Sequence, residues 1–334
     1  MNAMRLTEAD IARFQQDFAN LENALNAAIV GQNVVVEEVM LAVFAGGHVL
    51  LEGLPGLGKT NLIKALANAI GVTLGRVQCT PDLMPSDITG SEVLVDEGGA
   101  AAHRVEFRPG PVFASMVLVD EINRATPKTQ AALLEAMQEG RVTYGGTGHA
   151  LPQPFWVFAT QNPIELEGTY PLPEAQLDRF LFKVRIAFPP EETLLTLVDS
   201  ALDGEPADEV GLVLGAERVA EMMAQARETA IAEPVKRAAI DLVLATHAER
   251  PTAHALARAH FRCGASPRAL QALLRVARVR ALAAGRGHVS VDDIAASVLP
   301  ALRHRILLTI ESELDGTDTD AVLEGIVAEW RRTS

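Results

Sequence analysis

One octapeptide in this chain has the residue types and spacing of a phosphate-binding loop. It matches the pattern G-x-x-x-x-G-K-[ST] at every fixed position, with the residues Gly53, Leu54, Pro55, Gly56, Leu57, Gly58, Lys59 and Thr60. Glycines let the backbone wrap closely, so that successive N–H groups and a helix N-terminus point at one phosphate chain. Lys59 would reach the β- and γ-phosphates, and the Thr60 hydroxyl would ligate Mg²⁺. The octapeptide therefore predicts a nucleoside triphosphate site.

The surroundings of the octapeptide support this interpretation over a glycine-rich turn with a stray lysine. The apolar run His48–Glu52 before it is typical of a buried strand. The segment that follows, from Asn61 to Ala67, has helical spacing, and Asn61 would lie beside the bound nucleotide at the start of that helix. A strand, a glycine loop and a helix in this order are the context that a working phosphate loop requires.

Two carboxylates end another apolar run, about sixty residues downstream of the octapeptide. Asp120 and Glu121 follow Ser115–Val119. A strand that delivers an aspartate at its carboxyl end can place it in the outer sphere of Mg²⁺, beside Thr60. Glu121 would then polarise the attacking water as a general base or an orienting group. Such a strand ending is common by itself, and its position after the octapeptide makes it specific.

Three further polar residues could act on a triphosphate. The Asn162 amide, after the run Phe155–Thr160, could bond the γ-phosphate or the attacking water, although an asparagine before a proline also suits a turn. Arg179 and Arg268 carry guanidinium groups that match phosphate oxygens, whereas the default for an arginine is a solvated face or an ion pair. Arg268 follows Ser266, a candidate helix cap.

Composition limits the classes of function. The chain has 334 residues, 29 basic and 43 acidic, and its net charge of −14 argues against a nonspecific nucleic-acid surface. Cys79 and Cys263 are too few for a disulfide framework, and no zinc-type spacing is present. No apolar run has membrane-spanning length, and the first residues do not resemble a signal peptide. We therefore expect a cytoplasmic protein without a membrane span.

The predicted elements alternate between strands and helices in the first part of the chain. Apolar strand-like runs occupy His48–Glu52, Arg76–Cys79, Met116–Asp120, Phe155–Thr160 and Leu181–Phe188. Helices are expected at Thr7–Val30 and Val35–Ala45, and after Thr126 as a cap with Pro127 in the first turn. This alternation predicts an α/β fold with a parallel five-stranded sheet between helices. We expect this core at residues 1–190, a linker at 191–209 and a helical lid at 210–334.

Several long motifs in a fixed order make the chain resemble the MoxR family of AAA+ ATPases. They cover about residues 30 to 310 and are Gly53–Thr60, Thr80–Gly90, Phe107–Phe113, Asp120–Ala125, Ala159–Pro163, Glu167–Phe180 and Gly264–Arg268. Such a set is more specific than a phosphate loop alone. The resemblance implies an ATPase that uses ATP and Mg²⁺.

The resemblance also implies roles for individual positions. Asp120 and Glu121 match the Walker B acids, Asn162 matches sensor 1 and Arg268 matches sensor 2 in the lid. Arg179 matches the arginine finger, which acts on the nucleotide of a neighbouring subunit, and Arg124 is a rival for a role across that interface. The segment Ile29–Gln32, with Gly31 and Gln32, matches the part that packs near adenine. An insertion in helix 2 is expected at 82–112, and a hairpin near Arg141–Leu151.

Three functions remain open from the sequence. The first is an ATP-driven remodelling factor, a hexameric ring that matures partner proteins, in particular those of von Willebrand factor A type. The second is a nucleic-acid motor of the helicase type, against which the net charge of −14 weighs. The third is a nucleotide-switched, chelatase-like subunit with little turnover.

Overall fold

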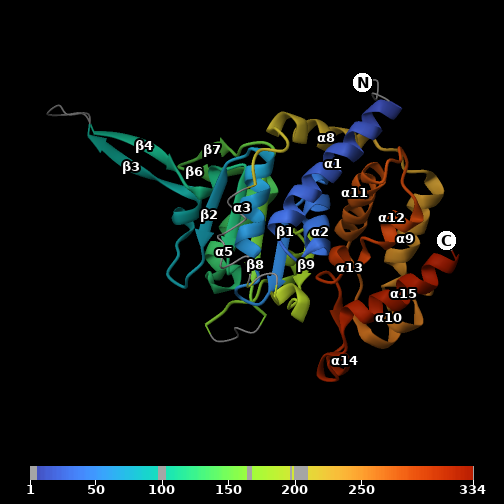
Figure 1. Cartoon of the computed structure of the whole chain (residues 1–334). Coiled ribbons are helices and arrows are strands. Elements are labelled where there is room, and N and C mark those ends of the chain that lie inside the picture. Colours follow the sequence, from blue (N-terminus) through green and yellow to red (C-terminus); the bar gives the residue numbers. More distant parts are fainter. Residues whose placement is uncertain (1–5, 97–102, 164–167, 196–197, 199–209, 334) are drawn as a thin grey trace.

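A parallel sheet of five strands forms the centre of the computed structural model, which describes residues 6–96, 103–163, 168–195, 198 and 210–333 (Figure 1). The strands lie in the order β2-β5-β8-β1-β9. Their bounds are Leu74–Gln78 (β2), Met116–Asp120 (β5), Trp156–Gln161 (β8), Val49–Gly53 (β1) and Phe182–Ile186 (β9). The predicted α/β fold class is confirmed. Because the strands are parallel, all five carboxyl ends meet at one edge of the sheet.

The strands are apolar throughout because both faces of the sheet are covered. In β1, Val49 and Leu51 belong to one buried cluster, whereas Leu50 between them belongs to a second cluster on the other face. Successive side chains of a strand point to opposite faces, so a strand buried on both sides needs a continuous apolar run.

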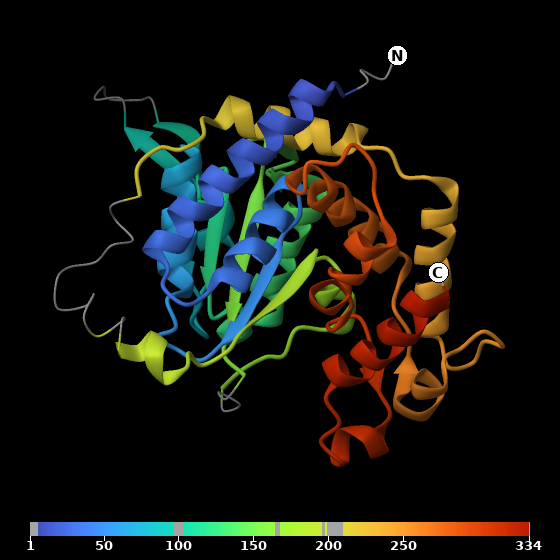
Figure 2. The ribbon, with the colours of Figure 1, turned by 45° about the vertical axis from the view of Figure 1, so that its right-hand side comes forward.

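Helices from different parts of the chain cover the two faces (Figures 1 and 2). The first cluster includes residues of α1 (Glu8–Ala28), α2 (Asn33–Phe44) and α3 (Lys59–Ile70), and the second includes residues of α4 (Pro85–Thr89) and α5 (Pro127–Glu139). The start of α1 is fixed by a capping box between Thr7 and Asp10. Thr126 is the N-cap residue of α5 as predicted, but its hydroxyl contacts Thr129 Oγ1 and makes no bond to a backbone N–H.

Two antiparallel hairpins extend the α/β core. The first pairs β3 (Gly90–Asp96) with β4 (His103–Pro109), lies within the 82–112 segment and projects from the body of the molecule (Figure 1). The second pairs β6 (Arg141–Tyr144) with β7 (Thr147–Ala150), where the resemblance predicted a hairpin. The Phe107 ring of β4 stacks on the His149 imidazole of β7, with 4.2 Å between the ring centroids. This aromatic contact joins the two hairpins.

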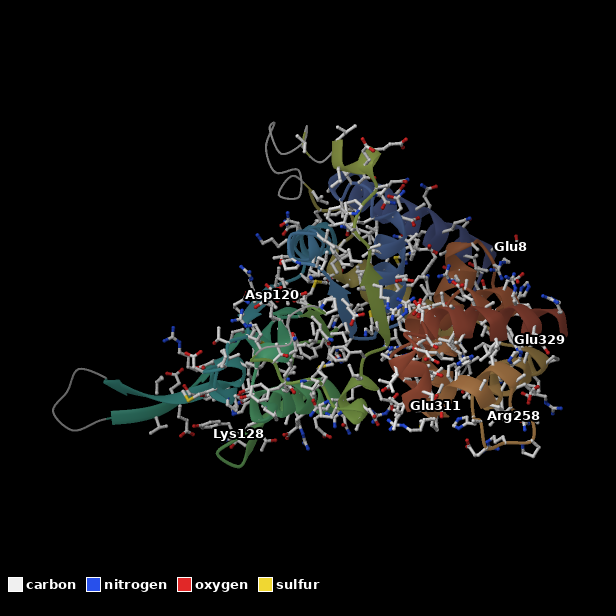
Figure 3. All side chains as sticks on the ribbon, turned by 90° about the horizontal axis from the view of Figure 1, so that it is seen from below. Glu8, Asp120, Lys128, Arg258, Glu311 and Glu329 are labelled. Atoms are coloured by element: carbon white, nitrogen blue, oxygen red, sulfur yellow. The ribbon has the colours of Figure 1, made fainter. Side chains whose placement is uncertain are left out.

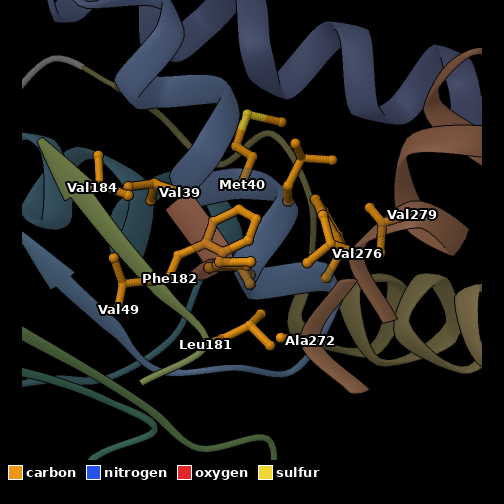
Figure 4. Packing of buried hydrophobic residues seen from close by; sticks show 14 of the residues in the cluster. Val39, Met40, Val49, Leu181, Phe182, Val184, Ala272, Val276 and Val279 are labelled. Carbon is orange, nitrogen blue, oxygen red and sulfur yellow. The ribbon is translucent and has the colours of Figure 1, made fainter. Parts of the chain in front are cut away.

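The remaining elements form a mostly helical lid. They are α8 (Ala216–Glu228), α9 (Glu233–Ala245), α10 (Ala255–His260), β10 (Phe261–Cys263), α11 (Pro267–Ala283), α12 (Val291–Ala295), α13 (Val298–Leu302), β11 (Leu307–Leu308), α14 (Ile310–Leu314) and α15 (Thr319–Thr333). One hydrophobic cluster spans the lid and the sheet, and Figure 4 shows Met40 of α2 and Phe182 of β9 near Val276 of α11. The lid therefore packs directly against β9, which is an outer strand of the sheet (Figure 2).

Candidate active site

The glycine loop joins the end of β1 to the start of α3. Gly56 and Gly58 have φ angles of +80° and +74°, a backbone region that favours glycine. Gly53 is required for a different reason, because a Cβ there would lie 2.9 Å from the Ile186 carbonyl oxygen in β9. The loop thus combines two left-handed turns with one close backbone contact. Loops with such left-handed residues can present consecutive N–H groups to one anion.

The charged and polar residues that follow lie in the first turn of α3. Lys59 is the first residue of the helix, and its Nζ donates to the carbonyl oxygens of Gly53 at 2.5 Å and Leu54 at 3.1 Å. Its ammonium group therefore lies across the loop that it belongs to. Thr60 and Asn61 come next, where the first N–H groups of the helix lack intrahelical partners and its dipole is positive. The arrangement suits a bound anion.

Asp120 ends β5 in the interior of the α/β core, away from the lid residues Arg258, Glu311 and Glu329 (Figure 3). It is 7% exposed. Its Oδ2 accepts a hydrogen bond from Arg76 Nε at 3.0 Å. Its carboxylate is thus paired with the half-exposed guanidinium of Arg76, at the carboxyl ends of the strands.

Glu121 has an unusual backbone conformation. Its φ of 57° is the only positive value among the non-glycine residues that the structure describes, and it turns the chain sharply out of β5 into the short helix η2 (Ile122–Arg124). Its backbone N–H donates to Thr160 Oγ1 at 2.8 Å. Its Oε2 accepts hydrogen bonds from Arg124 Nη1 at 3.0 Å and Gln78 Nε2 at 3.2 Å. One oxygen of the carboxylate is therefore held by two donors at the carboxyl ends of the strands.

The strand order brings Asn162 between the acids and the loop. Asn162 directly follows β8, is 7% exposed, and β8 lies between β5 and β1 in the sheet. Neighbouring strands are about 4.8 Å apart, so Asp120, Asn162 and Gly53 stand at successive positions along one edge. This juxtaposition is the one that a metal-assisted hydrolysis of a triphosphate needs.

The turn between α1 and α2 packs against the loop. Gln32 Nε2 donates to the Leu57 carbonyl oxygen at 2.6 Å. A Cβ on Gly31 would lie 2.1 Å from Thr193 Cγ2, so Gly31 and Thr193 are in close contact. Of the two predicted adenine-side residues, Gln32 thus contacts the glycine loop, whereas Gly31 contacts Thr193.

Arg179 and Arg268 lie near the amino ends of the strands, at the opposite end from the glycine loop and the acids. Arg179 precedes β9 by three positions, and its Nη1 donates to the Leu134 carbonyl oxygen at 2.8 Å. Arg268 Nε lies 4.0 Å from Asp178 Oδ2. Both line a cavity of 290 Å³ that also includes His48, the residue before β1. The five residues of β1 span about 16 Å, so the structure does not bring these arginines to the glycine loop of their own chain.

Sequence reasoning missed several residues that hold the site together. Thr160 belongs to the motif Ala159–Pro163 but had no predicted role, yet its hydroxyl contacts both Asp120 and the Glu121 N–H. Arg76 and Gln78 in β2 contact the two acids across the sheet. Their only signal in the sequence was that they are polar residues within a predicted strand, because the sequence does not show which strands are neighbours.

Cys79 is close to the acids, and its backbone N–H donates to the Asp120 carbonyl oxygen at 2.9 Å. It is 1% exposed, and its burial, together with the charges of Asp120 and Glu121, raises the pKa of its thiol to about 12. The thiol stays protonated at neutral pH, in line with its expected role as a small buried apolar group. Over the described part of the chain, no group of three metal-binding side chains is found, and no helix is long and apolar enough to cross a membrane.

Comparisons with known proteins agree with this geometry. Residues 48–182 match the model of the ATPase family associated with various cellular activities, and residues 253–326 match the AAA lid domain. The chain is 39% identical to the uncharacterized protein YeaC of Bacillus subtilis, with 91% of each chain covered. It is also 39% identical to the chaperone MoxR1 of Mycobacterium tuberculosis, over 90% of this chain and 78% of the relative. A crystal structure of a candidate ATPase from Cytophaga hutchinsonii superimposes with a TM-score of 0.86 at 36% identity, covering 95% of both chains.

Proposed function

Because the chain belongs to the MoxR family of AAA+ ATPases, we propose that it binds ATP and Mg²⁺ at Gly53–Thr60. We propose further that it hydrolyses the phosphoanhydride bond to the γ-phosphate in a site formed by two copies of the chain. One observation carries this proposal. The loop and acids stand at the carboxyl edge of the sheet, whereas Arg179 and Arg268 stand at the amino edge. A second copy of the chain would bring the two sets together.

The residues at the carboxyl edge have separate roles in this proposal. Lys59 exchanges its loop carbonyl contacts for the β- and γ-phosphates, and the Asn162 amide orients the γ-phosphate and the water. Glu121, already fixed by hydrogen bonds, accepts the proton of the attacking water. Thr60 and Asp120 offer the oxygen donors that Mg²⁺ prefers. The bound metal would neutralise charge on the phosphates.

The arginines at the amino edge would serve the neighbouring subunit. A guanidinium that approaches the γ-phosphate stabilises the charge that develops as the phosphoryl group leaves. Arg179 is our arginine finger, and Arg268, 47% exposed at its side chain, would approach the same nucleotide. The chain would therefore turn over ATP only in a ring, for which we propose six subunits.

The work of such a ring would be the remodelling or maturation of client proteins, among them von Willebrand factor A-type partners. The hairpin β3–β4 supports this part of the proposal because it projects from the body of the molecule (Figure 1). Its residue Phe107 is stacked on His149, and the second hairpin leads into β8 and Asn162. A change at the nucleotide would thus reach the projecting hairpin through packed groups.

Two substitutions test the division of the active site between copies. Arg179→Ala should leave the affinity for a fluorescent ATP analogue within about twofold while it lowers phosphate release about 10³-fold. Lys59→Ala should weaken analogue binding itself. Sedimentation velocity with and without ATP measures whether the subunits assemble into a ring. Equal loss of binding in the Arg179→Ala protein, or turnover per subunit that does not change on dilution to monomers, would overturn the proposal.

A further inference from the structure

The side chain of Arg305 is buried in the contact between the lid and the core, and all of its donors are used. The residue is 9% exposed. A guanidinium has five N–H groups. Those of Arg305 donate to Asp178 Oδ1 at 2.8 Å and to four carbonyl oxygens, of Asp178 at 3.0 Å, Phe180 at 2.6 Å, Leu181 at 3.1 Å and Ala301 at 2.5 Å. Only the last acceptor belongs to the lid.

The other four acceptors belong to residues that come directly before and after Arg179 in the chain. The carbonyl of Asp178 precedes Arg179, and those of Phe180 and Leu181 follow it. Arg305 thereby fixes the backbone on both sides of the proposed finger, while its bond to Ala301 ties the same guanidinium to α13. The segment has little regular structure of its own, since α6 (Glu174–Leu177) ends just before it.

Asp178, which belongs to the core, also binds a second residue of the lid. Its Oδ1 accepts a hydrogen bond from Ser266 Oγ at 2.7 Å as well as the one from Arg305. Ser266 is the N-cap residue of α11, as the sequence suggested, but its hydroxyl donates to Asp178 and makes no hydrogen bond to the helix backbone. Asp178 Oδ2 faces Arg268 Nε at 4.0 Å. One carboxylate thus contacts the start of α11 and lies next to both proposed trans-acting arginines.

We propose that Arg305 and Asp178 are positioning residues for the two trans-acting arginines. Their hydrogen bonds connect the segment around Arg179 to the lid. The lid, Arg179 and Arg268 would therefore approach the nucleotide of the neighbouring subunit as one rigid unit. This inference rests on the proposed function, in which Arg179 acts across the subunit interface. Neither residue touches the nucleotide of its own chain, because both lie at the amino edge of the sheet.

The substitution Arg305→Lys tests this role with little change in charge. A lysine keeps the cation but offers three donors as a point charge, and it cannot bind the side-chain and backbone oxygens of residues 178–181 together. The variant should bind an ATP analogue within about twofold of the unchanged protein. Its ATP hydrolysis should fall about 10- to 100-fold, the effect expected when a reacting group moves by about 1 Å.

A mixing experiment separates this role from general damage to the fold. A Lys59→Ala subunit has a broken loop but an intact finger, whereas an Arg305→Lys subunit has an intact loop but a displaced finger. Interfaces that combine the finger of the first with the loop of the second are complete. The mixture should therefore hydrolyse ATP faster than the sum of the two separate proteins.

Matched variants make every outcome informative. Arg303→Lys alters a neighbouring arginine with a 7% exposed side chain, which contacts Asp320 and the Lys183 carbonyl oxygen instead of residues 178–181, and it should keep at least half of the activity. Ser266→Ala removes one hydrogen bond to Asp178 without removing charge. If Arg305→Lys does not fold, Ser266→Ala takes its place, with a loss of about threefold that mixing restores.

A parallel mixture of Arg179→Ala with Lys59→Ala distinguishes the two levels of the proposal. If this mixture regains activity and the Arg305→Lys mixture does not, the arginine acts in trans but the positioning role is wrong. If neither mixture regains activity, the division of the site between copies is wrong as well. Full activity of Arg305→Lys alone would also overturn the positioning role.

Discussion

Arg124 Nη1 lies 3.0 Å from Glu121 Oε2 within the same chain. The sequence left Arg124 as a rival of Arg179 for a role across the subunit interface. The structure places it at the carboxyl edge of the sheet, in η2, where its guanidinium contacts the proposed base. Arg179 instead stands at the amino edge and contacts Leu134. The two arginines are therefore at opposite ends of the strands and contact different groups.

Substitution of Arg124 should affect the site of its own chain. Arg124→Ala removes one of the two hydrogen bonds that orient the Glu121 carboxylate, and we expect ATP hydrolysis to fall about tenfold with ATP affinity unchanged. Steady-state phosphate release measures the loss. Mixing with Lys59→Ala subunits should not restore this activity. Restoration would show that Arg124 acts across the interface after all.

Substitution of Glu121 itself should stop turnover with the nucleotide bound. Glu121→Gln keeps the size of the side chain and can still accept a hydrogen bond from Arg124, but it cannot take a proton from water. We expect hydrolysis to fall about 10²- to 10⁴-fold. ATP should remain on the protein after rapid gel filtration. Release of ADP at the unchanged rate would remove Glu121 from the role of base.

Two glycine substitutions should separate steric contact from backbone strain. Gly53→Ala places a Cβ 2.9 Å from the Ile186 carbonyl oxygen, so β1 and β9 must move apart, and we expect a loss of about 2–3 kcal/mol in the free energy of unfolding. Gly56→Ala meets no atom within 4 Å and bears only the cost of its φ of +80°, about 1 kcal/mol. Urea denaturation compares the two. An equal loss in both variants would contradict the proposed contact at Gly53.

Glu38 should make stability depend on pH. Burial raises the pKa of this α2 carboxyl from 4.5 to about 7, and Glu37 and Asp320 add to the shift, whereas Arg303 and Arg280 oppose it. Between pH 4.5 and 7 the folded chain holds a proton that the unfolded chain has lost, so stability falls as the pH rises through this window. Glu38→Gln cannot ionise and avoids that loss.

The measurement is the difference in unfolding free energy between the Glu38→Gln and unchanged proteins. We expect the variant to gain on the order of 2 kcal/mol at pH 8 relative to its difference at pH 4. Urea titrations at both pH values give this number. A difference that is the same at pH 4 and pH 8 would show that Glu38 ionises normally in the folded protein.

Much of the fold could be predicted from local patterns. The five apolar runs became the five strands of the sheet, with ends displaced by at most two residues, because a strand buried on both faces must be apolar along its whole length. Ser266 occupies the predicted N-cap position of α11, but its hydroxyl makes no hydrogen bond to the helix backbone. Its hydroxyl donates to Asp178, a residue 88 positions away, and no local pattern contains that contact.

The sequence by itself determined the chemistry that is local in the chain. The glycine loop, Lys59 and Thr60 are consecutive, and the pair Asp120 and Glu121 ends one strand, so their spacing alone indicated a triphosphate site. Only the tertiary structure decided which strands are neighbours, and thus that Asn162 stands between the acids and the loop. It also decided that Arg179 and Arg268 lie at the far edge. The physical reason is that a parallel sheet collects all of its carboxyl ends at one edge, while residues just before a strand lie about 16 Å away at the other.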